Sequence, residues 1–171
     1  MTLAEAAAQA DELAQSGSER ELADLRTTWG DELESAARSE DFRERAVAFR
    51  AVGQFRWRAK EELLRRGLDD QSPAARGSAL LSLELLSRDH PSTVNGVRPL
   101  LHTMATADGN AAVRRLAILC LKNGSPDRNT IVLLEGLSND DEMDAELRRA
   151  AAGVAQQLKK RQNQQQQQQK R

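Results

Sequence analysis

One stretch of the chain, residues 54–66, reads QFRWRAKEELLRR and sets an aromatic pair among five basic side chains. Rings that stack on bases and cations that meet phosphates are the chemistry of single-stranded nucleic-acid binding. Glu61 and Glu62 stand among these cations and favour a mixed solvated surface, because phosphate binding needs several uncompensated cations together. At about 100° per residue, Trp57 shares a helical face with Leu64, so we expect Trp57 to pack into the core.

The other residues that could carry chemistry form no recognisable site. His90 precedes Pro91 and His102 lies in a helical pattern, and neither has a Cys or a carboxylate at ligand spacing. Cys120 is the only cysteine, which excludes an internal disulfide and cysteine-based zinc patterns, and its apolar neighbours predict a buried, inert thiol. No glycine-rich phosphate loop and no Ser, His and Asp arrangement occurs. We therefore predict no catalytic residue, no metal and no cofactor.

The composition predicts that helices position any binding residues. In 171 residues, 39% hydrophobic side chains are enough for one core, whereas aromatic residues make up 3% and Tyr is absent. Abundant Ala, Leu, Arg, Glu and Gln favour an all-α domain. The acidic N-terminus does not resemble a secretory signal, and no window holds 18 uncharged apolar residues. We expect a cytoplasmic protein without a membrane partner.

The net charge of −1 hides an asymmetry along the chain. Residues 1–40 hold three Lys and Arg against ten Asp and Glu, a net of −7, whereas residues 41–171 hold 22 against 16, a net of +6. The chain thus has an acidic head and a mildly basic body. The basic excess is well below that of a dedicated DNA-binding domain.

Helical periodicity is interrupted by short stretches of Gly, Pro, Asp and Asn. Two helices are expected in residues 1–40, with Thr2 and Ser18 as candidate N-caps. Beyond them the spacing predicts helices over about 41–54, 57–68, 73–87, 92–106, 110–123, 126–138 and 142–160. Short turns join these helices into pairs, giving about eight to nine helices in all.

The first helices of successive pairs share a repeated pattern. The segments FRERAVAFR, ARGSALLSL, VRRLAILCL and LRRAAAGVA each have Arg in second place and Ala in fifth. Successive arginines are 33, 38 and 34 residues apart, at Arg43, Arg76, Arg114 and Arg148. In the last three copies an acid lies six residues before the arginine, at Asp70, Asp108 and Glu142.

This pattern resembles the HEAT repeat, in the short form of phycobilisome-lyase-type HEAT-like repeats. The resemblance covers about residues 41–160 and rests on a turn acid, a helix arginine and a small residue, namely Asp70, Arg76, Ala79, Asp108, Arg114, Ala117, Arg148 and Ala151. It implies an α-solenoid of stacked antiparallel helix pairs.

The physics of such a stack explains these residue types structurally. Small residues let neighbouring helices approach closely, and each turn acid can pair with an arginine of a stacked repeat, contributing at most about 1 kcal/mol where exposed. We predict this structural ladder for Asp70, Arg76, Asp108, Arg114, Glu142 and Arg148.

The resemblance also implies a binding surface. In HEAT-like stacks the second helix of each pair lines the concave side, and here those helices carry a sparse basic stripe of Arg58, Arg65, Arg98, His102 and Arg128. Glu62, Asn95 and Glu135 interrupt the stripe, which suits an acidic protein segment better than a continuous phosphate backbone.

The two ends of the chain differ from the repeats. Residues 1–40 form two amphipathic stripes that can cap the solenoid; alternatively, these acidic helices lie partly over the basic stripe and move aside for a partner. Residues 161–171 are rich in Gln and have no apolar face, which predicts a disordered or weakly helical tail.

These observations favour a non-catalytic scaffold or adaptor that binds a protein partner on the concave surface. Two alternatives remain open. The same stripe could bind nucleic acid, or the chain could be an enzyme similar to the HEAT-like bilin lyases and DNA glycosylases. No motif of those enzymes can be matched residue by residue. The oligomeric state and the identity of the partner do not follow from the sequence.

Overall fold

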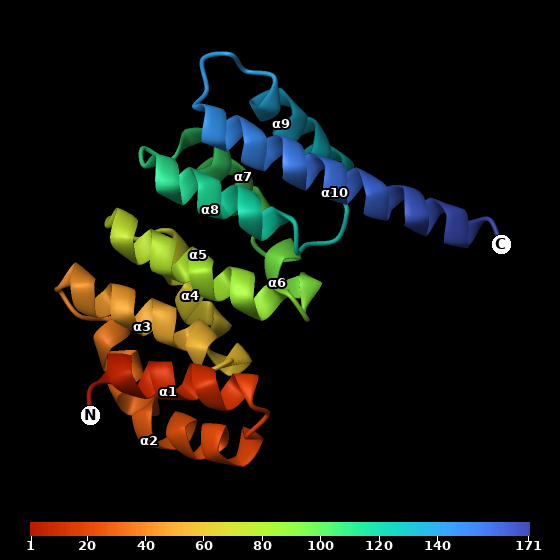
Figure 1. Cartoon of the computed structure of the whole chain (residues 1–171). Coiled ribbons are helices and arrows are strands. Elements are labelled where there is room, and N and C mark those ends of the chain that lie inside the picture. Colours follow the sequence, from red (N-terminus) through yellow and green to blue (C-terminus); the bar gives the residue numbers. More distant parts are fainter. The chain divides into compact units, whose positions relative to one another are not determined.

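The computed structural model describes all 171 residues and contains ten α-helices, one short 3₁₀-helix and no strand (Figure 1). The all-α class is confirmed, and the helix count is slightly above the eight to nine that the sequence predicts. The chain divides into two compact units, Met1–Leu86 and Ser87–Arg171, which are described separately. None of the helices is long and apolar enough to cross a membrane.

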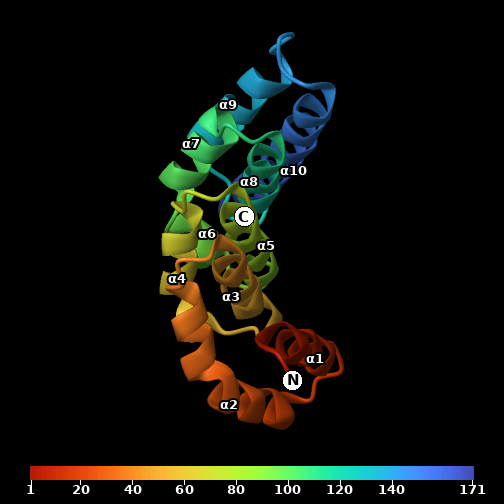
Figure 2. The ribbon, with the colours of Figure 1, turned by 90° about the vertical axis from the view of Figure 1, so that its left-hand side faces the viewer.

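The N-terminal unit places consecutive helices alternately in two layers. In Figure 2, α2 and α4 lie on one side, with α1, α3 and α5 on the other. Helices α1, α2 and α3 pack against one another. The elements of this unit are α1 (Leu3–Gln15), α2 (Glu19–Ala37), α3 (Phe42–Gln54), the 3₁₀-helix η1 (Arg58–Lys60), α4 (Glu61–Leu68) and α5 (Pro73–Ser87).

The acidic head is part of the core of the N-terminal unit. Helix α1 buries Leu3 and three alanines, and α2 buries Leu22 and Leu33. Alanine side chains allow the close packing of α1 against α3, and burial of these apolar groups stabilises the unit. Thr2 forms a complete capping box with Glu5, as expected of an N-cap, whereas Ser18 makes no side-chain cap hydrogen bond.

Helices α3 and α5 approach each other closely at Gly53. A Cβ at this glycine would lie 2.6 Å from the Cα of Ser82 on α5. The Ser82 hydroxyl accepts a hydrogen bond from the Gly53 amide (2.9 Å) and donates to the carbonyl of Phe49. Ser82 is fully buried, so these hydrogen bonds satisfy a polar group that would otherwise cost stability.

The C-terminal unit also has two layers. Figure 2 shows α7 and α9 on one side and α8 and α10 on the other. Helix α10 packs against both α8 and α9, and α7 packs against α8. The elements are α6 (Pro91–Asn95), α7 (Arg98–Ala107), α8 (Ala111–Leu121), α9 (Arg128–Ser138) and α10 (Ala145–Gln169).

One predicted helix is divided in two, which accounts for the higher helix count. The helix expected over 92–106 is split into α6 and α7. Pro99 lies in the first turn of α7. Its ring would clash with the carbonyl of Asn95, four residues back, if the helix were continuous. The break is therefore a local consequence of proline.

The glutamine-rich segment extends the last helix instead of forming a disordered tail. Helix α10 is continuous to Gln169, nine residues past the expected end near residue 160. Its last buried residue is Leu158, and beyond Gln162 the side chains are exposed. The segment has no Gly or Pro, and Gln has a high helix propensity, so an established helix can propagate through it.

Candidate protein-binding surface

The loop that leads into η1 fixes the position of the basic stretch. Arg56 has a left-handed backbone (φ 49°), which is uncommon for a residue with a Cβ. Arg26 of α2 donates hydrogen bonds to the carbonyls of Phe55 (2.8 Å) and Arg56 (3.1 Å). The Arg56 guanidinium in turn pairs with Asp11 of α1 at 2.7 Å. Two helices of the acidic head therefore hold this loop.

Trp57 packs in a way that the helical periodicity does not predict. Trp57 precedes η1 and lies outside the helix that was expected to begin there. The prediction that it shares a helical face with Leu64 is therefore wrong. The side chain is half-buried: its ring lies against Gly30 of α2, where an added Cβ would be 3.0 Å away, and 6.0 Å from the ring of Phe55. The Lys60 ammonium lies 5.2 Å from the Trp57 ring centroid, within cation–π range.

Lys60 also connects this region to α2. Its ammonium is 2.6 Å from the Glu34 carboxylate, and Arg38 approaches the same carboxylate at 3.6 Å. The hydrogen bond from Lys60 is the main reason that the pKa of Glu34 is lowered, with further contributions from the nearby charges of Arg38 and Arg66. One acid thus lies among three cations.

The two predicted binding residues of the N-terminal unit are exposed. Arg58 in η1 retains 49% of its side-chain exposure, with a 3.4 Å contact to Glu61. Arg65 and Arg66 are exposed near the C-terminal end of α4. We call the cations Arg58, Lys60, Arg65 and Arg66 the α4 surface. Lys60 is half-buried and the other three are exposed.

A shallow depression lies beside the α4 surface. It has a volume of about 540 Å³ and is lined by the ends of α2, α3 and α4. Three of its residues are arginines, Arg38, Arg45 and Arg66, and two are acids, Asp69 and Asp70. The mixed charge resembles a surface for a polar peptide more than a pocket for a single anion.

In the C-terminal unit, Arg98 supports a loop. Its guanidinium donates to the Asn95 side chain (2.7 Å) and to the Ser125 carbonyl (2.8 Å). The Asn95 side chain also bonds the amide and hydroxyl of Ser125, both at 2.9 Å. A Cβ at Gly124 would lie 2.7 Å from Val94, so the loop requires glycine at this position. Arg98 is therefore committed to local structure.

His102 is likewise engaged within the unit. Its Nε2 lies 2.8 Å from the hydroxyl of Thr130, a residue that is only 2% exposed. Asp127 caps α9 through the Thr130 amide at 3.0 Å. Burial lowers the pKa of His102, Asp127 opposes this shift, and the nearby charge of Arg98 adds to it. Of the three predicted residues in this unit, Arg128 alone is exposed, in the first turn of α9.

One acid–arginine pair of the predicted kind is present, but its arginine lies two residues from the expected one. Arg45, not Arg43, pairs with Asp70, at 2.8 and 3.0 Å. Arg45 donates to the carbonyls five and six residues before it, and Arg76 does the same. Arg45 is thus the equivalent of Arg76, whereas Arg43 bonds its own cap residue Asp41. This equivalence follows from the hydrogen bonds to the turn carbonyls, which the structure shows and the sequence pattern does not.

Several later ladder residues also make contacts within the C-terminal unit. Arg114 donates to the Ala105 carbonyl at 3.0 Å and contacts the sulfur of Met143. Asp108 accepts a hydrogen bond from the Asn110 amide at the end of α7. Arg148 lies 3.9 Å from Asp141, and Glu142 is exposed in the preceding turn.

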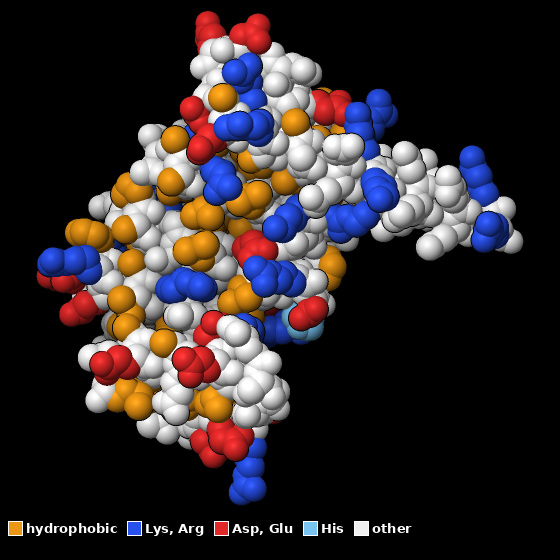
Figure 3. All heavy atoms as spheres, in the orientation of Figure 1, with side chains coloured by type: hydrophobic (Ala, Val, Ile, Leu, Met, Phe, Trp, Pro, Cys, Tyr) orange, Lys and Arg blue, Asp and Glu red, His pale blue; other side chains and the backbone are white.

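The structure contains no cluster of three or more His, Cys, Asp or Glu side chains that could hold a metal ion. Cys120 is fully buried on α8. Figure 3 shows Lys and Arg side chains gathered over α8 and α10, in addition to the residues that the sequence singled out. These helices are the first of their pairs, where the repeat pattern predicts structural rather than binding arginines, so the pattern does not indicate them as a binding surface.

The chain matches no protein-family model, no curated protein and no solved structure. The resemblance to HEAT repeats therefore stays a prediction from the sequence pattern.

Proposed function

We propose that this chain is a non-catalytic interaction module built from HEAT-like helix pairs, and that it binds an acidic protein segment on the α4 surface. The observation that carries this proposal is a group of exposed cations on η1 and α4, which follow a loop held by α1 and α2: Arg58, Arg65 and Arg66. Arg98 and His102, in contrast, are committed to contacts inside their own unit.

Rigidity of the loop before η1 supports a binding role. The hydrogen bonds of Arg26 and the ion pair of Arg56 order the loop before any partner arrives. A preformed surface avoids the entropy cost of ordering side chains and loops on binding. The depression beside α4 offers additional contacts to a segment that carries both charged and polar side chains.

A protein segment suits this surface better than nucleic acid does. Trp57, the aromatic residue next to these cations, has its ring against Gly30 and beneath the Lys60 ammonium, so it is not a free platform for a base. Acids at Glu34 and Glu61 interrupt the cations. Phosphate binding requires cations that are not compensated in this way.

The test uses Trp57 fluorescence in a Trp29→Phe background. The protein is titrated with a short peptide rich in Glu and Asp, and separately with a deoxythymidine oligonucleotide of equal charge. We expect the peptide to bind and the double change Arg58→Glu and Arg65→Glu to weaken it by at least tenfold, about 1.4 kcal/mol. The matched control is Arg20→Glu with Arg115→Glu, two exposed arginines elsewhere, and it should bind normally.

Tighter binding of the oligonucleotide than of the peptide, lost in the same double variant, would favour nucleic acid instead. Equal binding by the double variant and the control would show that the α4 surface is not the site.

A further inference from the structure

Helix α2 presents an acidic stripe to solvent. Glu21, Asp24, Asp31 and Glu32 are all exposed and make no ion pair within the chain. At 100° per residue they lie within an arc of about 100°, together with Thr28. Four like charges on one face repel each other, so a basic partner that neutralises them would be favoured. We call this set the α2 stripe.

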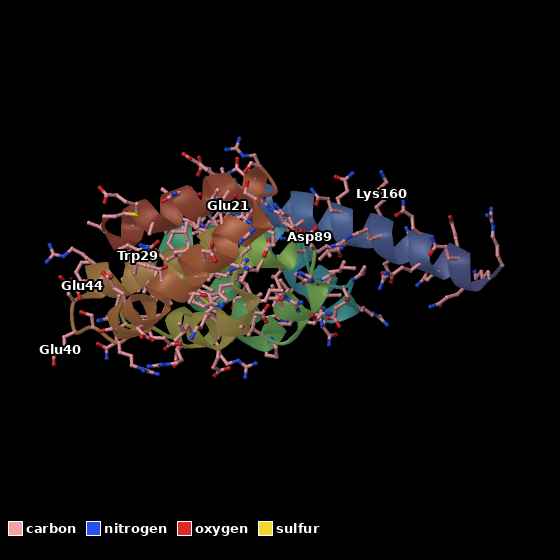
Figure 4. The ribbon with its side chains drawn as sticks, turned by 90° about the horizontal axis from the view of Figure 1, so that it is seen from below. Glu21, Trp29, Glu40, Glu44, Asp89 and Lys160 are labelled. Carbon is pink, nitrogen blue, oxygen red and sulfur yellow. The ribbon has the colours of Figure 1, made fainter.

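Helix α10 presents a complementary stripe. Arg149 and Lys160 are exposed and about 20° apart around the helix, with the exposed residues Ala152, Gly153 and Gln156 between them. A Cβ added at Gly153 would meet no atom within 4 Å, so another helix could approach the backbone closely here. We call Arg149, Lys160 and the residues between them the α10 stripe. Figure 4 labels Glu21 on α2 and Lys160 on α10.

The spacing of the charges matches between the two helices. Glu21 and Glu32 are eleven residues apart, and so are Arg149 and Lys160. At 1.5 Å per residue each pair spans about 16 Å along its helix. Two helices packed face to face could therefore bring both acids opposite both bases, with the helices running in either direction.

We propose that the α2 stripe of one molecule docks on the α10 stripe of a second copy of this chain. The charges of the two units support this partner, because Met1–Leu86 holds 12 Lys and Arg against 17 Asp and Glu, whereas Ser87–Arg171 holds 13 against 9. The contact joins two different surfaces of the protein. Two molecules can therefore form a dimer with two reciprocal contacts, or many molecules can associate head to tail. It uses neither Arg58 nor Arg65 and stands independently of the proposed function.

Sedimentation velocity over a concentration series, at low salt and at about 0.5 M salt, tests this association, since exposed ion pairs are screened at high salt. The wild-type sedimentation coefficient should rise with concentration at low salt only. Arg149→Glu with Lys160→Glu should abolish the rise, and so should Glu21→Lys with Glu32→Lys. Circular dichroism checks that both variants remain helical.

The decisive sample mixes the two variants in equal amounts. The reversed α2 stripe of one variant then faces the reversed α10 stripe of the other, and association should return to at least half of the wild-type increase. A wild-type protein that is monomeric at every concentration, or a mixture that stays monomeric, would overturn the proposal.

Discussion

Gly53 and Ser82 show how a single side chain fixes the distance between two helices. The Ser82 hydroxyl bonds to the α3 backbone where no Cβ is present, and a Cβ there would be 2.6 Å from the Ser82 Cα. Neither the repeat pattern nor the periodicity indicates this contact, because a serine in an apolar helix is compatible with many positions. It is visible only when the two helices are placed together.

We expect Gly53→Ala to destabilise the protein by about 1–3 kcal/mol, because the backbone of α5 must move to admit the methyl group. The matched control is Gly136→Ala in α9, where an added Cβ meets nothing within 4 Å. That change should stabilise the helix by up to about 1 kcal/mol. Urea denaturation measures both. Equal effects of the two substitutions would contradict the close approach of α3 and α5.

The Arg45–Asp70 pair predicts a pH dependence of stability. The hydrogen bonds from Arg45 are the main reason that the pKa of Asp70 is lowered, and burial opposes the shift. Because the folded pKa lies below the unfolded pKa, near 3.9, the pair stabilises the fold above that pH and this stability is lost as the pH falls through the folded pKa.

Asp70→Asn should therefore cost about 2 kcal/mol at neutral pH, and this cost should shrink as the pH falls below about 3.9 towards the folded pKa of Asp70. Asp31→Asn, at an exposed acid of α2, serves as the control and should change little over the same range. Urea denaturation at several pH values measures the difference. A gap between wild type and Asp70→Asn that does not narrow at acidic pH would show that the charge of Asp70 is not what stabilises the fold.

At the scale of elements, the acidic head is integral to the N-terminal unit. Helices α1 and α2 bury apolar side chains against α3, and Asp11 and Arg26 hold the loop before η1. Deleting residues 1–40 should expose the face of α3 that packs against α1 and α2, and lower the thermal midpoint by at least about 10 °C.

Circular dichroism with thermal melting tests the deletion. A shortened chain that retains its midpoint and binds the acidic peptide more tightly would favour the alternative in which the head is a movable cover.

The outer part of α10 should contribute little to stability. From Asn163 onward its side chains are exposed, and Arg161, which bonds to the Lys122 carbonyl, is the last anchored residue. Removing residues 163–171 should change the unfolding free energy by less than about 0.5 kcal/mol while reducing the helical signal. A larger loss in urea denaturation would mean that the glutamine segment packs on the protein.

The sequence predicted most elements because their signals are local. Apolar spacing, capping residues and Gly or Pro stops place most helix ends within a few residues, whereas α10 continues nine residues past its expected end. The prediction fails at Trp57, which lies before η1 instead of inside a helix, and at Pro99, where the expected helix is divided. In both places a single residue departs from the helical conformation. The Arg45–Asp70 pair was missed because the first repeat departs from the others by two residues, and a pattern aligned on Arg43 cannot reveal that shift.

At the scale of the whole molecule, charge is distributed unevenly, with a net of −5 in Met1–Leu86 and +4 in Ser87–Arg171. The sequence identified this asymmetry but assigned the binding cations to a single stripe. The structure instead separates the exposed Arg58 and Arg65 from Arg98 and His102, which are engaged locally. How exposed each cation is depends on short-range contacts that spacing alone does not reveal.

The most direct test of the proposed function is a pull-down from lysate at near-physiological salt. Half of each sample is treated with nuclease, and the wild type is compared with the Arg58→Glu and Arg65→Glu variant and with the Arg20→Glu and Arg115→Glu control. The account predicts a discrete protein that survives nuclease, remains with the control and disappears from the α4 variant. Bound material that vanishes with nuclease, or a protein that the α4 variant still retains, would contradict it.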